Sequence, residues 1–276
     1  MNRIEIAGTA AVALAALFFI FAERRRPYNP GQRLFRPGFW NDLVLYGLVQ
    51  SFVLGLVIGR IIGALDAGTD WSRLHLVSDW PILWQLVFFF VVHDLYIYFF
   101  HRLQHRSRFL WRFHEAHHSV ENVDWLSGVR SHSLEILVNQ TVEFAPIVLL
   151  GAAPEVAVLK GMVSAVWGMF IHSNLDVRLG VLQYVVNGPE MHRWHHANDP
   201  AAYNRNFATK LALWDWLFGT AYFPPRDERN AAKYGLAGTP FPEAFPSGYF
   251  VQQALAFRPA ADPPGKSAPD GSGGAT

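Results

Sequence analysis

The stretch WPILWQLVFFFVVHDLYIYFFHRLQH, residues 80–105, begins as an apolar helix and ends in two histidines. Residues 80–100 supply the roughly 20 largely apolar residues that an α-helix needs to cross a bilayer. If the helix continues, Asp94, His101 and His105 share one face, because offsets of seven and four residues preserve the face of an α-helix. The segment therefore predicts metal-binding side chains at the point where a membrane helix leaves the lipid.

Other apolar segments lie on both sides of this stretch. They cover residues 4–22, residues 39–65 and a hairpin at residues 134–171 that turns at Gly151 to Pro154. Hydrophobic residues make up 51% of the chain and charged residues only 16%. The hairpin fits either two spans or a re-entrant pair. The sequence predicts an all-α integral membrane bundle with about four to five apolar segments, rather than a soluble protein with buried helices.

The arginines indicate an orientation. Arg24, Arg25 and Arg26 follow the first apolar segment instead of preceding it, which is typical of a signal anchor with its N-terminus outside. Alternation of the later spans then places every histidine cluster on the cytosolic side. Arginine far outnumbers lysine, which favours a bacterial source and therefore the bacterial cytoplasmic membrane.

Composition divides the chain into three parts. We expect an anchor helix and basic loop over residues 1–37, a membrane-embedded catalytic domain over 38–224, and a C-terminal extension over 225–276 that is disordered from about residue 258. The chain has no cysteine, which excludes disulfides, zinc–cysteine sites and iron–sulfur ligation by this chain. The net charge of +1 gives no indication of nucleic-acid binding.

Eight of the 12 histidines fall in three clusters with helical spacing, called here the first, second and third histidine boxes. The first box is His101 and His105, the second is His114, His117 and His118, and the third is His192, His195 and His196. Residues three and four apart lie on one helix face, so each cluster directs two or three imidazoles toward one point. Three such faces are suited to a metal pair, and imidazole suits Fe, Zn, Cu and Ni. His172 lies at the predicted depth of these clusters and is a ninth candidate. The predicted metal ligands are His101, His105, His114, His117, His118, His172, His192, His195 and His196.

Two other classes of protein also use clustered histidines. His114-Glu115-x-x-His118 spells the zincin signature, in which two histidines bind zinc and the glutamate activates water. A membrane zinc metalloprotease is therefore the alternative, although it leaves the first and third clusters without a role. A metal transporter or a haem protein would place histidines along a path or in pairs across spans, and the clusters do neither.

Seven motifs follow one another along the chain: DLYIYFFHRLQH (94–105), HEAHH (114–118), VRSHSLE (129–135), HSN (172–174), PEMHRWHH (189–196), NFA (206–208) and LWDWLFGTAY (213–222). In these motifs the chain resembles the fatty acid hydroxylase/sterol desaturase superfamily of membrane di-iron oxygenases, and the resemblance covers residues 85–224. Two residues depart from the usual pattern, Ser133 where the family has proline and Ala208 where it has glycine. Gly168 stands where some members carry a further histidine.

This resemblance implies two iron ions, O2 as co-substrate, and attack on an aliphatic C–H bond of a lipid or sterol-like substrate from the bilayer. It leaves hydroxylation and desaturation both open, with hydroxylation preferred. The chain shows no dinucleotide-binding fingerprint, so electrons should come from a separate reductase with a ferredoxin or cytochrome. Carboxylates and amides near the boxes are expected to orient the imidazoles through their second nitrogen. The candidates for that role are Asp94, Glu115, Asn174, Glu190, Asn206 and Asp215.

Overall fold

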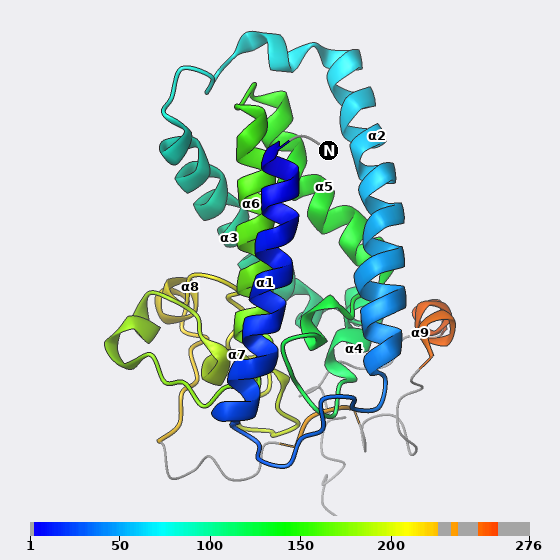
Figure 1. Cartoon of the computed structure of the whole chain (residues 1–276), viewed down its shortest axis with the longest axis vertical. Helices are drawn as coiled ribbons and strands as arrows, with labels where there is room; N and C mark the ends of the chain where they lie inside the picture. The colour runs from blue at the N-terminus through cyan, green and yellow to red at the C-terminus, as the bar shows by residue number, and fades with distance from the viewer. Residues whose placement is uncertain (1–2, 226–232, 237–247, 259–276) are drawn as a thin grey trace, which may run out of the picture.

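The computed structural model describes residues 3–225, 233–236 and 248–258. Within these residues the protein is helical, with no β-strand and two isolated β-bridges. Long helices stand side by side, and short helices gather at one end of them (Figure 1). The predicted all-α class is confirmed.

Four helices are long and apolar enough to cross a membrane: α1 (Arg3–Arg25), the continuous η1–α2 pair (Asn41–Gln50 and Ser51–Thr69), α3 (Ile82–Arg106) and α6 (Pro154–His172). At 1.5 Å per residue, the 25 residues of α3 extend over about 37 Å, which exceeds the hydrocarbon thickness of about 30 Å. Large apolar side chains point outward from these helices, including Leu14, Phe52 and Leu83, each more than 60% exposed. An apolar outer surface of this extent is suited to contact with lipid.

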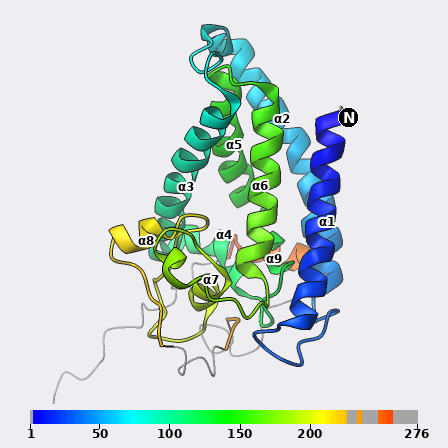
Figure 2. The ribbon, with the colours of Figure 1, turned by 60° about the vertical axis from the view of Figure 1, so that its left-hand side comes forward.

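The predicted hairpin forms two antiparallel helices, α5 (Ser133–Leu149) and α6. α5 runs from the end that holds the short helices to the opposite end of the bundle, and α6 runs back (Figure 2). Gly151 in their turn has φ +72°, and a Cβ there would lie 2.7 Å from the carbonyl oxygen of Ser72 in η2 (Trp71–Leu74). The turn therefore packs against the connection between α2 and α3, far from the histidine boxes.

The short helices form the functional end of the molecule. The carboxyl ends of α1, α3 and α6 reach this end, whereas the N-terminus of α1 lies at the opposite one (Figures 1 and 2). The short helices at this end are α4 (Arg108–His118), η3 (Ser127–Val129), η4 (Gly180–Tyr184), α7 (Pro189–His196), α8 (Leu213–Leu217) and α9 (Tyr249–Leu255).

A buried carboxylate joins α1 to this end. Glu23 Oε1 accepts hydrogen bonds from the backbone N–H groups of Trp125 and Asn174, both at 2.8 Å. One turn earlier, Phe19 packs in a core cluster with Trp125 and Leu126. The first helix is thus fixed to the loop that follows α4 and to the segment that follows α6 at His172.

Two arginines and two aspartates form a buried network beneath the second box. Asp42 accepts from both Arg36 (2.8 Å) and Arg130 (2.7 and 2.8 Å), and Arg36 also pairs with Asp124 (2.8 and 2.9 Å). All four residues are at most 4% exposed. Buried charges of this kind are tolerated because each is paired and hydrogen-bonded. The network ties the start of η1 to the loop between α4 and α5.

Neutralising the shared carboxylate should destabilise the protein strongly. Asp42→Asn leaves the buried Arg130 guanidinium without its negative partner, which typically costs about 3–5 kcal/mol of unfolding free energy. Thermal unfolding in detergent should show a clearly lower midpoint for Asp42→Asn. The same substitution at the exposed Asp79 should change stability by no more than about 0.5 kcal/mol. Equal midpoints for the two variants would contradict the role given to the network.

Candidate metal centre

The first box lies on α3, which continues past the predicted span as expected. Asp94, His101 and His105 are all buried on one face of this helix. The helix ends at Arg106 and is followed at once by α4, whose N-cap Ser107 accepts a hydrogen bond from the backbone N–H of Leu110. The tight connection brings the second box back toward the first.

The second and third boxes lie on short helices that repeat one geometry. His114, His117 and His118 occupy the last two turns of α4, and His192, His195 and His196 occupy those of α7. Pro189 begins α7, where a missing N–H has no cost and a fixed φ favours the helix. Arg193 of α7 donates to the carbonyl oxygens of Ser173 (2.6 Å) and Leu175 (3.0 Å), which holds the third box against the end of α6.

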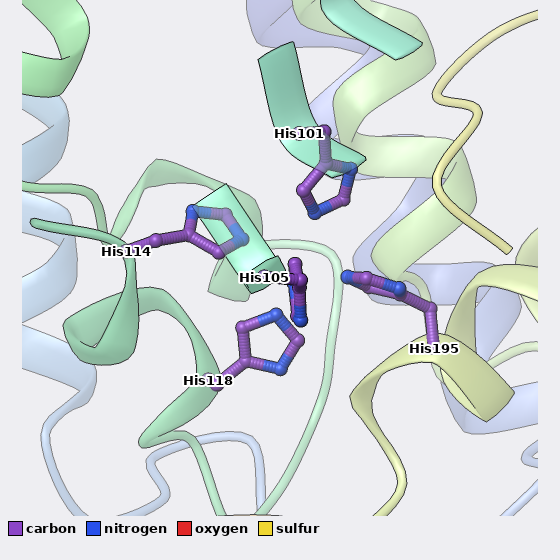
Figure 3. Close-up of side chains that lie close together, drawn as sticks. All are labelled: His101, His105, His114, His118 and His195. Carbon is purple, nitrogen blue, oxygen red and sulfur yellow. The ribbon is translucent and has the colours of Figure 1, made fainter. Parts of the chain in front are cut away.

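All nine predicted ligands come together in two groups, one of five histidines and one of four. The nitrogen atoms that each group offers lie within 4.8 Å of one another. The groups adjoin, because the ring of His118 in the first stacks on that of His196 in the second with centroids 4.5 Å apart. The first group, whose rings converge in Figure 3, is His101, His105, His114, His118 and His195; the second is His117, His172, His192 and His196.

Oxygen atoms behind the rings fix the orientation of five imidazoles. Four of these oxygens are backbone carbonyls and one belongs to the carboxylate of Glu135. Because a carbonyl oxygen can only accept, the ring proton lies on Nδ1 and the lone pair on Nε2. The Nδ1 contacts are His101 to Phe207 O (2.7 Å), His114 to Glu135 Oε1 (2.9 Å), His117 to Arg130 O (3.0 Å), His172 to Gly168 O (2.8 Å) and His195 to Arg205 O (2.8 Å).

Within the described part of the chain, the Nε2 atoms of the two groups lack hydrogen-bond donors from outside the histidines. In the first group all five Nε2 atoms are buried without a hydrogen-bond partner among the described residues. In the second, Nε2 atoms approach each other instead, with His172 lying 3.0 Å from His192 and 3.3 Å from His117. Lone pairs directed at a common point, with no donor between them, fit a cation. The residues present therefore fit a metal ion in each group.

Burial keeps these rings neutral. It lowers the pKa of His195 to about 3, and it lowers the pKa of His117, His118, His192 and His196 well below the usual range. Neighbouring imidazoles add to the effect on those four because they disfavour a second positive charge. Neutral imidazole is the form that binds metals, so the protein holds these ligands ready without having to remove protons at pH 7.

Asp94 and Asp215 were predicted to contact imidazoles, but each contacts a segment whose backbone in turn contacts an imidazole. Asp94 accepts from Thr209 Oγ1, from the backbone N–H groups of Lys210 and Leu211, and from Trp214 Nε1. Asp215 accepts from the N–H groups of Phe207 and Ala208 and from Thr220 Oγ1, and burial raises its pKa to about 6. Both therefore hold the 207–214 segment, and the backbone of that segment holds His101.

Asn206 acts in a related way. It lies in the left-handed region with φ +55°, which asparagine tolerates better than most residues, and its side chain bonds the backbone of Met191 and Tyr222. Its two neighbours, Arg205 and Phe207, provide the carbonyl oxygens that accept from His195 and His101. The amide was expected to touch an imidazole, but it fixes the turn that aims two carbonyls at imidazoles.

The remaining three candidates pair with groups outside the two histidine groups. Glu115 forms an ion pair with Arg258 (2.8 Å), Glu190 one with Arg178 (3.1 Å), and Asn174 bonds the backbone of Asn29. Burial raises the pKa of Glu115 to about 7, while Arg258 opposes the rise. In a zincin the glutamate lies at the metal, whereas Glu115 is bound to an arginine and five histidines converge beside it. The protease alternative finds no support.

The orienting residue that the sequence did not assign is Glu135. Glu135 follows His132 by three residues in the motif SHSLE, and this helical spacing is the only sequence feature that could have indicated its role. His132 itself is a helix cap, accepting from the backbone N–H of Leu134 through Nδ1 and reaching Gln253 O through Nε2. Its omission from the predicted ligands agrees with this position.

Comparison with known proteins identifies the family. The model of the family described as fatty acid hydroxylase matches residues 86–220. The ornithine lipid hydroxylase OlsE of Rhizobium tropici is 38% identical over 235 residues, which cover 83% of this chain and 69% of that protein. The chain belongs to the fatty acid hydroxylase family. The resemblance to the superfamily inferred from the histidine boxes is confirmed.

More distant relatives of the family share the region of the boxes. The alkylglycerol monooxygenase of Danio rerio is 31% identical over 60% of this chain but only 36% of its own length. The methylsterol monooxygenase 1 of Rattus norvegicus is 32% identical over 47% of this chain and 44% of its own. No solved structure matches the chain. The names of these relatives agree with the predicted class of oxygen-dependent enzyme.

One glycine offers a test of the second group. A Cβ at Gly128 would lie 2.7 Å from His172 Nδ1, so Gly128→Ala must displace an imidazole that Gly168 O holds in place. The variant should retain markedly less metal than the unaltered protein, measured by elemental analysis after purification. Gly168→Ala is the matched control, because its Cβ would meet nothing within 4 Å. Equal metal content in the two variants would contradict the role of His172.

Proposed function

We propose that the protein is a membrane di-iron oxygenase that uses O2 to hydroxylate an aliphatic C–H bond of a polar lipid. The observation that carries the proposal is the set of nine buried histidines in two adjoining groups, with the Nε2 atoms of the first group lacking any other partner. The five-histidine group would hold one iron and the four-histidine group the other. Bound iron would supply the redox chemistry that O2 activation requires.

A cavity beside the histidines provides room for the substrate. It has a volume of about 240 Å³, touches members of both groups, and extends between α3, α5 and α6. Ile97, Phe100, Trp167 and Ile171 line it near the histidines. These side chains would exclude water from the reacting C–H bond and hold the substrate by dispersion contacts.

The relatives favour hydroxylation over desaturation. A hydroxylase and two monooxygenases are named for the insertion of oxygen into lipids, and the first of them covers most of this chain. The chain's own contribution would be to hold neutral ligands at fixed angles and to present the lipid to them. Electrons would come from a separate reductase with a ferredoxin or cytochrome.

The distribution of arginine supports a cytosolic active site. Arg24 and Arg25 end α1, and Arg106 and Arg108 flank the junction of α3 and α4, so all four lie at the histidine end. Basic residues favour the cytosolic side of a membrane helix. The N-terminus would then lie outside, in the bacterial cytoplasmic membrane.

The proposal predicts oxygen-dependent lipid hydroxylation that requires both groups. Bacteria expressing the chain under ¹⁸O2 should accumulate a lipid that carries one labelled oxygen atom, detected by mass spectrometry of the lipid extract. His114→Ala removes a member of the first group and His192→Ala one of the second, so each should abolish the product.

His75→Asn is the matched control, since His75 is exposed, lies far from the site and has a left-handed φ of 50° that asparagine accepts. This variant should keep full activity. A product labelled from water instead of O2, or one that survives His192→Ala in correctly inserted protein, would refute the proposed function.

A further inference from the structure

The cavity changes character with distance from the histidines. Its far end is lined by His93, Glu143, Ser164 and Lys210, with Lys160 directly behind Glu143. His93 precedes His101 on α3 by eight residues, and Glu143 follows Glu135 on α5 by eight residues. Eight residues of α-helix correspond to about 12 Å, so the polar end lies about that far from the first group along the bundle. Polar groups inside a membrane bundle are costly, and they usually mark a functional site.

The hydrogen bonds at this end leave a donor on His93 without an acceptor. Lys160 is ion-paired with Glu143, whose Oε1 also accepts from Ser164 Oγ (2.8 Å). The Lys160 ammonium also lies 3.2 Å from His93 Nδ1, which must accept because an ammonium can only donate. The proton of the neutral ring therefore lies on Nε2, and this atom is buried without a partner.

Lys210 is a second donor at this end of the cavity. The residue is only 7% exposed, and its backbone is held by Asp94. Its ammonium lies 5.9 Å from the centre of the Phe90 ring and interacts electrostatically with Glu143, which lines the same cavity. No hydrogen bond joins the ammonium to a described residue. An ammonium that lines a cavity without a hydrogen-bond partner can donate to an anionic ligand, and such charge-assisted hydrogen bonds are strong.

The geometry points to an anion-binding pocket formed by His93, Glu143, Lys160 and Lys210. Lys160 is paired with Glu143, and the two groups that make no such pair, Lys210 Nζ and His93 Nε2, are both donors that line the cavity. We propose that this anion pocket receives a carboxylate or phosphate of the lipid substrate, held by Lys210 Nζ and His93 Nε2. The inference rests on the proposed function for the identity of the bound molecule as a substrate.

The anion pocket would determine where the lipid is oxidised. A substrate anchored there places its reacting C–H bond within about 12 Å of its charged group, the span between the pocket and the first histidine group. A cavity of 150 Å³ holds benzene, so 240 Å³ accommodates a group of about ten non-hydrogen atoms. This size fits a small polar headgroup with its adjoining carbons, and it is too small for a pair of acyl chains.

Binding measurements on the iron-loaded, full-length protein in detergent test the pocket. The probes are N-palmitoyl ornithine with a free carboxylate, its methyl ester, and a palmitoyl lysophosphatidate. Hydrogen bonds to charged groups are strong enough that the acid should bind at least about tenfold more tightly than the ester. Lys210→Gln should remove this preference, and Lys210→Arg, which keeps the charge, should preserve it. Lys233→Gln, the same change at an exposed lysine, should leave it intact.

The lysophosphatidate identifies the anion. Tighter binding than the N-palmitoyl ornithine, with the same dependence on Lys210, would assign the pocket to a phosphate, and weaker binding would assign it to a carboxylate. Equal affinity of acid and ester, or a preference unchanged in Lys210→Gln, would overturn the inference. If Lys210→Gln loses iron or melts early, His93→Phe removes the other unpaired donor and should weaken acid binding in the same way.

Product analysis separates this inference from the proposed function. Binding of the acid through Lys210 without any O2-dependent hydroxylation would refute the proposed function but still support the anion pocket. Equal hydroxylation of acid and ester by both the unaltered protein and Lys210→Gln would refute the anion pocket but still support the proposed function.

Discussion

The site depends on one interaction, the donation of an imidazole Nδ1 proton to an oxygen behind the ring. This bond selects the tautomer, and it leaves the Nε2 lone pair directed at the centre of its group. It is seen for five of the nine histidines, and in four of them the acceptor is a backbone carbonyl. A carbonyl can orient a ligand only if its own peptide is rigid. The loops around the boxes are therefore as important to the centre as the histidines are.

Buried carboxylates, amides and arginines explain that rigidity. Asp215 and Asn206 fix the turn that presents the carbonyls of Arg205 and Phe207. Asp42 fixes Arg130, whose carbonyl accepts from His117. Buried charge in this protein thus supports the backbone, and the backbone supports the imidazoles. Glu135, which contacts His114 directly, is the exception.

The sequence predicted the frame of the site better than its details. Helical spacing placed His101 and His105 on one face of α3, and the box geometry predicted the faces of α4 and α7, because these relations are local to one helix. The contacts of Asp94 and Asn206 could not be read in this way, since their partners lie in other segments. His93, Glu143 and Lys160 are likewise separated by 17 or more residues, and only the packing of α3, α5 and α6 brings them together.

Iron K-edge X-ray absorption on the purified protein, combined with iron quantification, tests the central claim most directly. The account predicts about two iron ions per chain with a first shell dominated by imidazole nitrogen. A single iron per chain, or a shell dominated by oxygen, would contradict the assignment of the two histidine groups to two metal ions.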